Sequence, residues 1–406
     1  MHALAVCVVL AACGSSSTSS PPATATAAPT ATAAPTAGAT AAGCLGTAAT
    51  PAPSPGTGAG PSTPALATIQ FVSSRQGWVA GRGRILATGD AGATWTLQYS
   101  GPEVLSLVDF VDAHTGWAVG LDGLLGTTDG GGCWRRLGET DPPLASVHFT
   151  GPLHGWGVTG AAGSRGGLPN TIVVGDGVPL PPAGGRLVTT DDGGVSWHAA
   201  PAAPAGVQSA CFSDAAHGWL GAAGRLYRSG DGGTSWREVP GLPQQPGGPS
   251  SVVSLQCAAP DSVWLLDLSL EGAAGNQPYA AYASTGGGPL VELFEDMFGG
   301  TVDRPAPGSY PGPLSVIGTT TAAFAGRTPG FPDEPVGLEE ATVTGATVSI
   351  AHVGRVPGVD QAWGAAFLSS TTGWLVADTG YQDRHAVILA TTDGGRTWTR
   401  RYTTGS

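Results

Sequence analysis

The sequence predicts an all-β fold, a seven-bladed β-propeller made of four-stranded antiparallel blades. Three observations lead to this prediction: a turn motif that recurs along the chain, an aromatic motif that precedes it, and a composition rich in glycine and poor in charge. The chain of 406 residues contains 66 Gly and 34 Pro, and only 11% of its residues are charged. This composition suits many short strands joined by tight turns better than it suits long helices.

The turn motif has eight residues, with a hydroxyl residue first, Asp third and Trp last. Its clearest copy, Thr391–Trp398, reads TTDGGRTW. The other copies are Thr88–Trp95, Thr127–Trp134, Thr190–Trp197 and Ser229–Trp236. We call these five segments the Asp turns. Asp beside Gly-Gly is typical of a tight connection between strands, because Gly adopts positive φ and the carboxylate accepts nearby backbone N–H groups.

The aromatic motif places Phe seven residues before a Trp that usually follows Gly. Its copies are Phe71–Trp78, Phe110–Trp117, Phe149–Trp156, Phe212–Trp219 and Phe367–Trp374, and Cys257–Trp264 keeps the spacing without the Phe. A short run such as Arg84-Ile85-Leu86 lies between this motif and the Asp turn. One unit therefore reads as four short strands separated by turns.

Two further units are degenerate. Ser284–Val291 keeps Ser and Gly of the turn, and Ala341–Val348 keeps Gly345 and Thr347. With them the chain holds seven units, whose turns end at residues 95, 134, 197, 236, 291, 348 and 398. A four-strand unit with a shortest period near forty residues matches the signature of a propeller, in which neighbouring blades cover each other's apolar faces.

The Asp turn resembles the Asp-box, also called the bacterial neuraminidase repeat. The combined unit resembles the photosystem II stability and assembly factor family over about residues 66–402. The resemblance implies a propeller with Asp-box turns. It does not imply one activity, since similar boxes occur in sialidases, xyloglucanases and sortilin-type receptors.

The acidic residues of the turns are predicted to be structural rather than catalytic. A residue that recurs in every regular unit serves the unit itself, and a carboxylate in such a turn can accept N–H groups of its own loop. The structural residues are Asp90, Asp129, Asp192, Asp231 and Asp393.

The N-terminal region predicts export. Residues 1–12 are predicted to be a signal peptide, because the apolar run Ala3–Ala12 is too short to span a bilayer. The sequence Leu-Ala-Ala-Cys at residues 10–13 resembles the bacterial lipobox, which implies lipid attachment at Cys13. A secretory signal cleaved nearby is the alternative, because no basic residue precedes the run. Residues 13–65, rich in Ser, Thr, Pro and Ala, predict a disordered tether that holds a cell-surface, lipid-anchored propeller over residues 66–402.

The remaining cysteines permit disulfides in an exported chain. Cys211 and Cys257 lie eight and seven residues before Trp219 and Trp264 in consecutive units, so they are a candidate disulfide. The roles of Cys44 and Cys133 stay open. No spacing resembles a metal-ligand motif, and neither a metal nor a cofactor is predicted.

Strand alternation divides the surface into two faces. The Asp turns share one face with the turns between first and second strands. The long insertions belong to the opposite face, which we call the insertion face; they are residues 161–185, 267–283, 292–312, 326–340 and 378–385. Arg84, Arg186 and Arg225 each precede an Asp turn by four residues, so they should occupy one rim position of the insertion face. They are candidate ligands for an anion or a partner, with solvated arginine as the alternative.

Charge and residue patterns favour a binding protein over an enzyme. A net charge of −12 argues against nucleic-acid binding. We expect a monomeric, assembly-factor-like propeller that engages a protein or cell-envelope ligand through the insertion face. The alternative is a secreted glycoside hydrolase of sialidase or xyloglucanase type. That chemistry needs two facing carboxylates, and no pair is recognisable by spacing among the insertions. Sialidases also carry Arg-Ile-Pro where this chain has Arg84-Ile85-Leu86.

Overall fold

The computed structural model describes residues 43–45, 65–120, 123–160, 185–243, 251–268, 278–296, 304, 306–327, 336–379 and 385–404. The chain divides into two compact units, Met1–Thr40 and Ala41–Ser406, and all the described residues belong to the second. The predicted signal peptide, Cys13, most of the tether, most of the insertions 161–185, 267–283, 326–340 and 378–385, and part of the insertion 292–312 lie outside the described residues. No described helix is long and apolar enough to cross a membrane.

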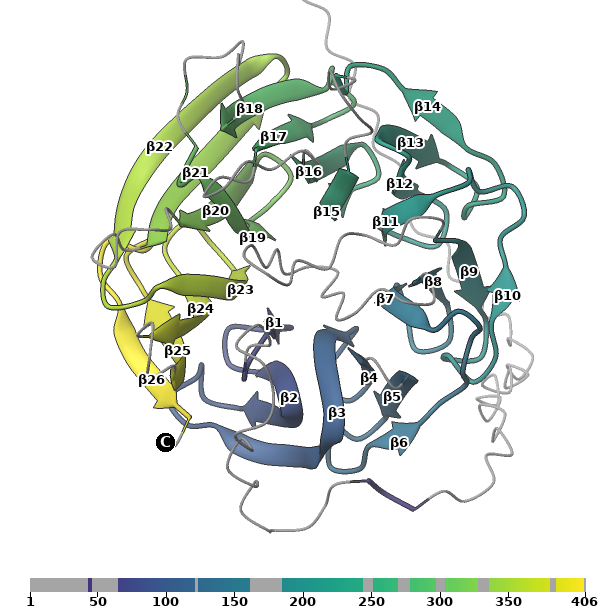
Figure 1. The fold of residues 1–406 in the computed structure, drawn as a ribbon, viewed down its shortest axis with the longest axis vertical. Helices are drawn as coiled ribbons and strands as arrows, with labels where there is room; N and C mark the ends of the chain where they lie inside the picture. The colour runs from purple at the N-terminus through teal and green to yellow at the C-terminus, as the bar shows by residue number, and fades with distance from the viewer. Residues whose placement is uncertain are drawn as a thin grey trace, which may run out of the picture. The chain divides into compact units, whose positions relative to one another are not determined.

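The described elements are 26 β-strands, arranged in sheets around a central axis (Figure 1). The first sheet has six strands in the order β1 (Thr68–Phe71), β2 (Gly77–Thr88), β3 (Thr96–Phe110), β4 (Gly116–Gly120), β5 (Gly123–Thr127) and β6 (Arg135–Arg136). All pairs within it are antiparallel.

Five four-stranded sheets follow in chain order. The second contains β7 (Leu144–Phe149), β8 (Gly155–Thr159), β9 (Leu187–Thr190) and β10 (His198–Ala199). The third contains β11 (Val207–Phe212), β12 (Gly218–Ala222), β13 (Arg225–Ser229) and β14 (Arg237–Val239). The fourth contains β15 (Ser251–Ala259), β16 (Ser262–Leu268), β17 (Tyr279–Ser284) and β18 (Val291–Asp296). The fifth contains β19 (Tyr310–Val316), β20 (Thr321–Arg327), β21 (Val336–Thr344) and β22 (Thr347–Val356). The sixth contains β23 (Gln361–Phe367), β24 (Gly373–Thr379), β25 (His385–Thr391) and β26 (Thr399–Thr403).

The prediction of seven blades is wrong, because the described strands form six hydrogen-bonded sheets and so a propeller of six blades. The difference arises in β3, a continuous strand of 15 residues. Its first part pairs with β2, from Thr96 to Val104, and its second part pairs with β4, from Leu105 to Phe110. The first two sequence units therefore share one strand and join into a single six-stranded sheet.

The core lies between successive sheets, where the two aromatic motifs meet. The ring of Phe149 stacks on Trp117 of the preceding sheet, with centroids 3.4 Å apart, and meets Trp197 of its own Asp turn edge-on. The same stacking joins the last sheet to the first, since Phe71 lies on Trp374 at 3.7 Å. Such rings supply most of the apolar area buried between sheets, so the motif spacing explains how the ring closes.

A second set of contacts runs around the axis through the innermost strands. The residue before the Phe position of one strand bonds to the backbone of the next strand. Gln70 Oε1 accepts the Phe110 N–H at 2.6 Å, and Asp109 Oδ2 accepts the Phe149 N–H at 2.7 Å. Further links of this kind are His148–Phe212, Gln256–Val316 and Ser315–Phe367. We call this series the axial belt. It ties neighbouring strands together where no sheet hydrogen bonds connect them.

Candidate functional site

The Asp turns use their carboxylates internally. In the turn Thr88–Trp95, Asp90 accepts the Thr88 hydroxyl at 2.8 Å, the Thr94 N–H at 2.9 Å and the Thr94 hydroxyl at 2.6 Å. The Thr88 oxygen in turn accepts the Gly92 N–H at 2.9 Å. The other turns repeat these bonds around Asp129, Asp192, Asp231 and Asp393, except that Asp129 has no hydroxyl donor at the seventh turn position. These carboxylates act as turn acceptors.

The same donors keep the turn carboxyls ionised. The hydroxyl of Thr94, followed by its backbone N–H, lowers the pKa of Asp90 to about 2. Thr397 lowers the pKa of Asp393 to about 2 in the same way. A carboxyl with such a pKa carries no proton at neutral pH and is unsuited to general acid catalysis.

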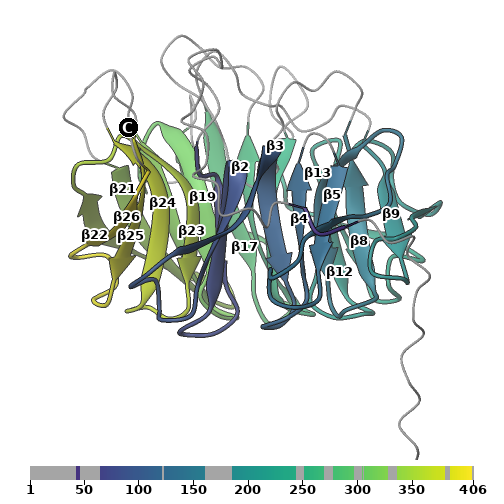
Figure 2. The same cartoon turned by 90° about the horizontal axis from the view of Figure 1, so that it is seen from below.

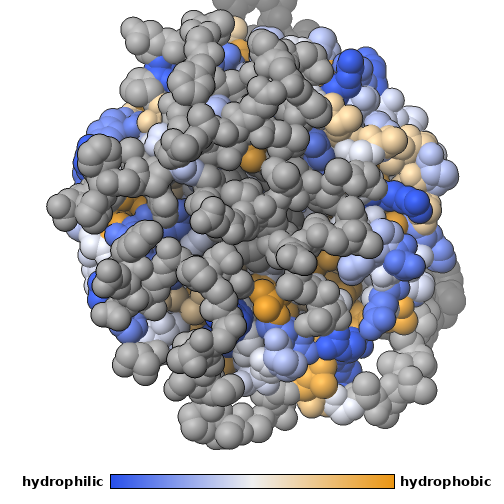
Figure 3. All heavy atoms as spheres, in the orientation of Figure 1, coloured by the Kyte–Doolittle hydropathy of each residue, from blue (hydrophilic) through white to orange (hydrophobic). Residues whose placement is uncertain are grey.

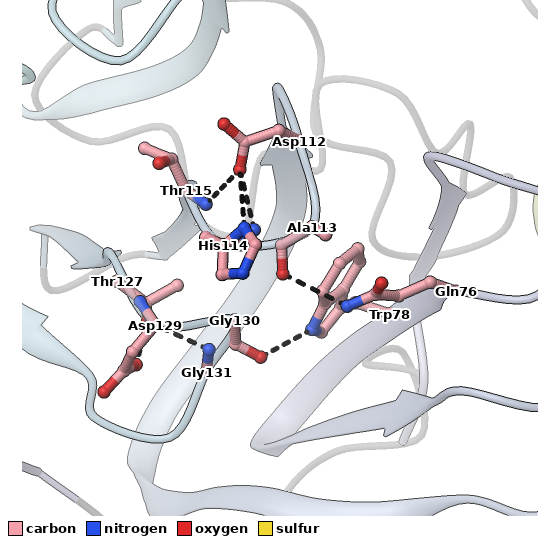
Figure 4. Close-up of polar contacts among 10 residues, drawn as sticks. All are labelled: Gln76, Trp78, Asp112, Ala113, His114, Thr115, Thr127, Asp129, Gly130 and Gly131. Carbon is pink, nitrogen blue, oxygen red and sulfur yellow. Dashed lines mark hydrogen bonds and ion pairs between the residues drawn. The ribbon is translucent and has the colours of Figure 1, made fainter.

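The Asp turns share their face with the turns between first and second strands, as Figure 4 shows for one unit. The Gly130 N–H donates to the carbonyl of His114 at 2.7 Å, which joins the two turns. The Trp78 indole N–H of the preceding unit donates to the Gly130 carbonyl at 3.2 Å, and Gln76 Nε2 donates to Ala113 O at 3.1 Å. On this face, hydrogen bonds therefore connect the two turns of one unit and also connect that unit to the preceding one.

The indole contact recurs in each described unit that has this Trp and is followed by a unit with an Asp turn. Further pairs are Trp117–Gly193, Trp156–Gly232 and, across the ring closure, Trp374–Ala91. Trp219 and Trp264 precede the two degenerate units, and their buried N–H groups have no hydrogen-bond partner among the described atoms. The regular turns thus supply acceptors that the degenerate turns lack.

Two of the three predicted arginines, Arg186 and Arg225, lie at the start of the third strand of their sheets, whereas Arg84 lies within β2. Arg225 begins β13 and pairs with Glu238 at 2.5 Å. Arg186 is exposed and directly precedes β9. Arg84 is partly buried in β2, and its Nε has no hydrogen-bond partner among the described atoms. Arg186 and Arg225 therefore have similar places in their sheets, Arg84 has a different one, and no ion pair or hydrogen bond joins one of these arginines to another among the described residues.

Among the described residues of the predicted insertions, carboxylates lie on β16, β18 and β21. Burial, followed by the nearby Glu292, Asp267 and Glu295, raises the pKa of Tyr282. Glu339 is buried and accepts from His352 Nδ1 at 2.7 Å. Glu340 follows it on β21, so its side chain points to the opposite face of the sheet, and burial raises its pKa. Glu292 and Glu295 lie on β18 in the preceding sheet.

A cavity of about 330 Å³ lies on the axis, and its lining comes from β1, β3, β7, β11, β15, β19 and β23. Axial-belt residues such as Asp109 and His148 form part of its wall. Burial raises the pKa of Asp109, an effect that His148 opposes. Trp363, the one Trp outside both motifs, is 3% exposed and also lines the cavity. In the described part of the chain, no group of three or more His, Cys, Asp or Glu side chains could hold a metal ion.

Two disulfides are present. Cys211 and Cys257 are joined across β11 and β15, at the place in the axial belt where the other strands use a hydrogen bond. Cys44 is joined to Cys133 of the second Asp turn. The sequence left this second pair open, although Cys133 in place of the usual hydroxyl was a visible departure. Cys13 lies outside the described residues.

Comparisons with known proteins show a shared fold. No family model matches the chain, and no curated protein does. Among solved structures, the chain is similar to YCF48 bound to D1 peptide, at 17% identity over 82% of this chain and 93% of that one, with a TM-score of 0.49. It is similar to the GH74 enzyme of Niastella koreensis at 12% identity, over 84% of this chain and 66% of that one, with a TM-score of 0.51. It is also similar to the GH74 xyloglucanase of Xanthomonas campestris at 12% identity, over 83% and 67%, with a TM-score of 0.49. With a TM-score of 0.51, the likeness to the Niastella koreensis enzyme supports a shared fold and assigns no activity. The Asp-box and lipoprotein resemblances stay predictions from the sequence.

Proposed function

We propose that this protein is an exported propeller, lipid-anchored at Cys13, that binds a protein or cell-envelope ligand through its insertion face, in the manner of an assembly factor and without catalysis. The observation that carries the proposal is the hydrogen bonding of the Asp turns. Their carboxylates are bonded within each turn, and the indole groups of four units are bonded to turn carbonyls. The polar groups of the Asp-turn face therefore stabilise the ring, and we expect a ligand to bind at the opposite face.

The insertion face can be located from the last strand. Strand β26 begins after an Asp turn and ends at the face that Figure 2 places uppermost and Figure 3 turns to the viewer. The described residues visible on this face include both hydrophilic and hydrophobic ones (Figure 3).

The arginines supply the chemistry for such a ligand. Arg84 Nε has no acceptor among the described atoms, and Arg186 is exposed. A guanidinium group binds carboxylates and phosphates through two parallel N–H bonds. Arg225 already pairs with Glu238, so a competing acidic group would have to displace that carboxylate. We therefore expect an anionic ligand or an acidic protein surface.

A binding experiment with matched charge changes tests the proposal. The full chain is immobilised, envelope extract is passed over it, and captured proteins and glycans are quantified by mass spectrometry. Replacing Arg84, Arg186 and Arg225 with Glu should reduce capture at least about tenfold, because charged hydrogen bonds are lost and repulsion is added.

The control reverses three exposed arginines near the Asp-turn face, Arg75, Arg135 and Arg396. It changes the net charge equally and should leave capture intact. Equal capture by both variants would contradict an insertion-face site. Hydrolysis of chromogenic glycosides or xyloglucan by the wild-type chain would instead favour the glycoside hydrolase.

A further inference from the structure

We propose that the Cys44–Cys133 disulfide and the Leu45 backbone lock the N-terminal segment onto the second Asp turn, so that the chain leading to the anchor leaves the propeller at this turn. The lock itself follows from the contacts of residues 43–45. Its consequence for anchoring depends on the proposed function.

The second Asp turn departs from the other four at the residue that makes the bridge. Thr94, Ser196, Ser235 and Thr397 each donate a hydroxyl to the carboxylate of their turn at 2.6 Å. Cys133 occupies this position, and its sulfur is bonded to Cys44. Its backbone N–H still donates to Asp129 Oδ1 at 2.9 Å. The turn therefore keeps its shape and exchanges one internal bond for a covalent bond to the N-terminal segment.

The neighbouring residue adds a second attachment, which the disulfide holds in place. The Leu45 N–H donates to the Trp134 carbonyl at 2.8 Å, in an antiparallel bridge beside the outer strand β6. The Leu45 side chain packs against the hydrophobic cluster that contains Trp134, Trp78 and Phe110. A backbone bond and an apolar contact thus hold the segment in one register next to the disulfide.

The lock changes the length of chain available for tethering. Between Cys13 and Cys44 the sequence advances 31 positions, whereas it advances 52 positions between Cys13 and Ala65, where the described propeller begins. Full extension limits these stretches to about 110 Å and about 180 Å. The exit point also lies at an Asp turn, whereas Arg225 lies at the opposite end of strand β13 from its own Asp turn.

Reduction releases this lock selectively. A dithiol transfers two electrons and two protons to the bridge, which becomes two thiols while the dithiol becomes a cyclic disulfide. Cys44 is exposed and its partner is 8% exposed, so a reductant reaches the bridge from the Cys44 side. In the other disulfide, Cys211 is 3% exposed and Cys257 is only partly exposed, and both line the axial cavity. Mild reduction should open the Cys44–Cys133 bridge first.

Hydrogen exchange of the full chain tests the lock. The matched variant is Cys44→Ser with Cys133→Thr, because Thr restores the hydroxyl that the other turns use and so leaves the Asp turn intact. In the oxidised wild-type chain, the Leu45 amide should exchange at least about tenfold more slowly than an unprotected amide. It should lose this protection in the variant and after treatment with dithiothreitol, while amides of the turn Thr127–Trp134 stay protected.

Two outcomes would overturn the proposal. One is an unprotected Leu45 amide in the oxidised wild-type chain, and the other is undiminished protection in the double variant. A Cys13→Ser chain, which cannot be lipidated at that residue, should show the wild-type exchange pattern. Membrane fractionation of the wild-type and Cys13→Ser chains tests the anchor separately, so failure of the anchor and failure of the lock are distinguishable.

Discussion

Trp374 closes the ring, and replacing it with Phe tests how the units are held together. Its indole is 2% exposed, stacks on Phe71 with centroids 3.7 Å apart, and donates to the Ala91 carbonyl at 3.0 Å. Phe at this position keeps an aromatic ring over Phe71 but leaves the carbonyl without its donor. Loss of a bond to a buried carbonyl costs about 1–3 kcal/mol, and the smaller ring loses about 1 kcal/mol of apolar burial.

Together these terms predict a loss of about 2–4 kcal/mol in the free energy of unfolding. At about 2 °C per kcal/mol for a large domain, the melting temperature should fall by about 4–8 °C. Scanning calorimetry of the full chain measures this change.

Trp264→Phe is the matched control. Trp264 is fully buried like Trp374, but its N–H has no acceptor among the described atoms. The substitution removes the same volume and also removes an unsatisfied donor, so its cost should be about 1 kcal/mol or less. Equal melting temperatures for the two variants would refute the reasoning that indole bonds to the Asp turns hold the ring.

Three further predictions concern the axis and the turns. Burial raises the pKa of Asp109, so the ionised side chain destabilises the fold above that pKa. Asp109→Asn should therefore raise the melting temperature at pH 7, and this gain should shrink as the pH is lowered toward 4. Calorimetry across this pH range measures the change. Asp90 and Asp393 have pKa values lowered from 3.8 to about 2. The stabilisation of the fold by their ionised carboxylates is therefore present above pH 3.8 and is lost as the pH falls through about 2. Acid titration followed by circular dichroism measures this loss. Gly194 has a φ of 89°, and a Cβ there would lie 2.8 Å from Leu124 Cδ2, so Gly194→Ala should cost about 1–3 kcal/mol in urea unfolding.

Much of the architecture could be predicted because the repeat residues contact one another. The Phe and Trp positions recur at fixed spacing since each Phe stacks on a Trp of the preceding unit, as Phe149 does on Trp117. The Asp positions recur since each carboxylate orders its own turn. Residues that recur in the sequence therefore make the same contacts in each unit. For this reason the all-β organisation and the location of the turns could be predicted.

The blade count could not be predicted because it was taken from the number of sequence units, and the first two units share one strand. This strand, β3, continues through Gly101-Pro102. Glu103 follows them, buried, and bonds to the Tyr99 hydroxyl and to Arg136 Nη2, which holds the extended path. Tertiary contacts decided the conformation there.

The axial belt and the N-terminal lock were missed for a different reason. The belt uses Gln70, Asp109 and His148 at equivalent positions, so its members share a location without sharing a residue type. The lock joins Cys44, within a low-complexity stretch, to a turn 89 residues away. Contacts of this kind leave no periodic trace in the sequence.

The central claim is that the Asp turns hold the ring while the opposite face binds. Its most direct test measures capture from envelope extract by three full-length chains: wild type, Asp192→Ala, and the variant with Glu at Arg84, Arg186 and Arg225. All three are compared well below their melting temperatures. We predict that Asp192→Ala melts earlier and captures normally, whereas the arginine variant melts normally and captures at least about tenfold less. Loss of capture in Asp192→Ala with an unchanged melting temperature, together with normal capture by the arginine variant, would contradict the claim.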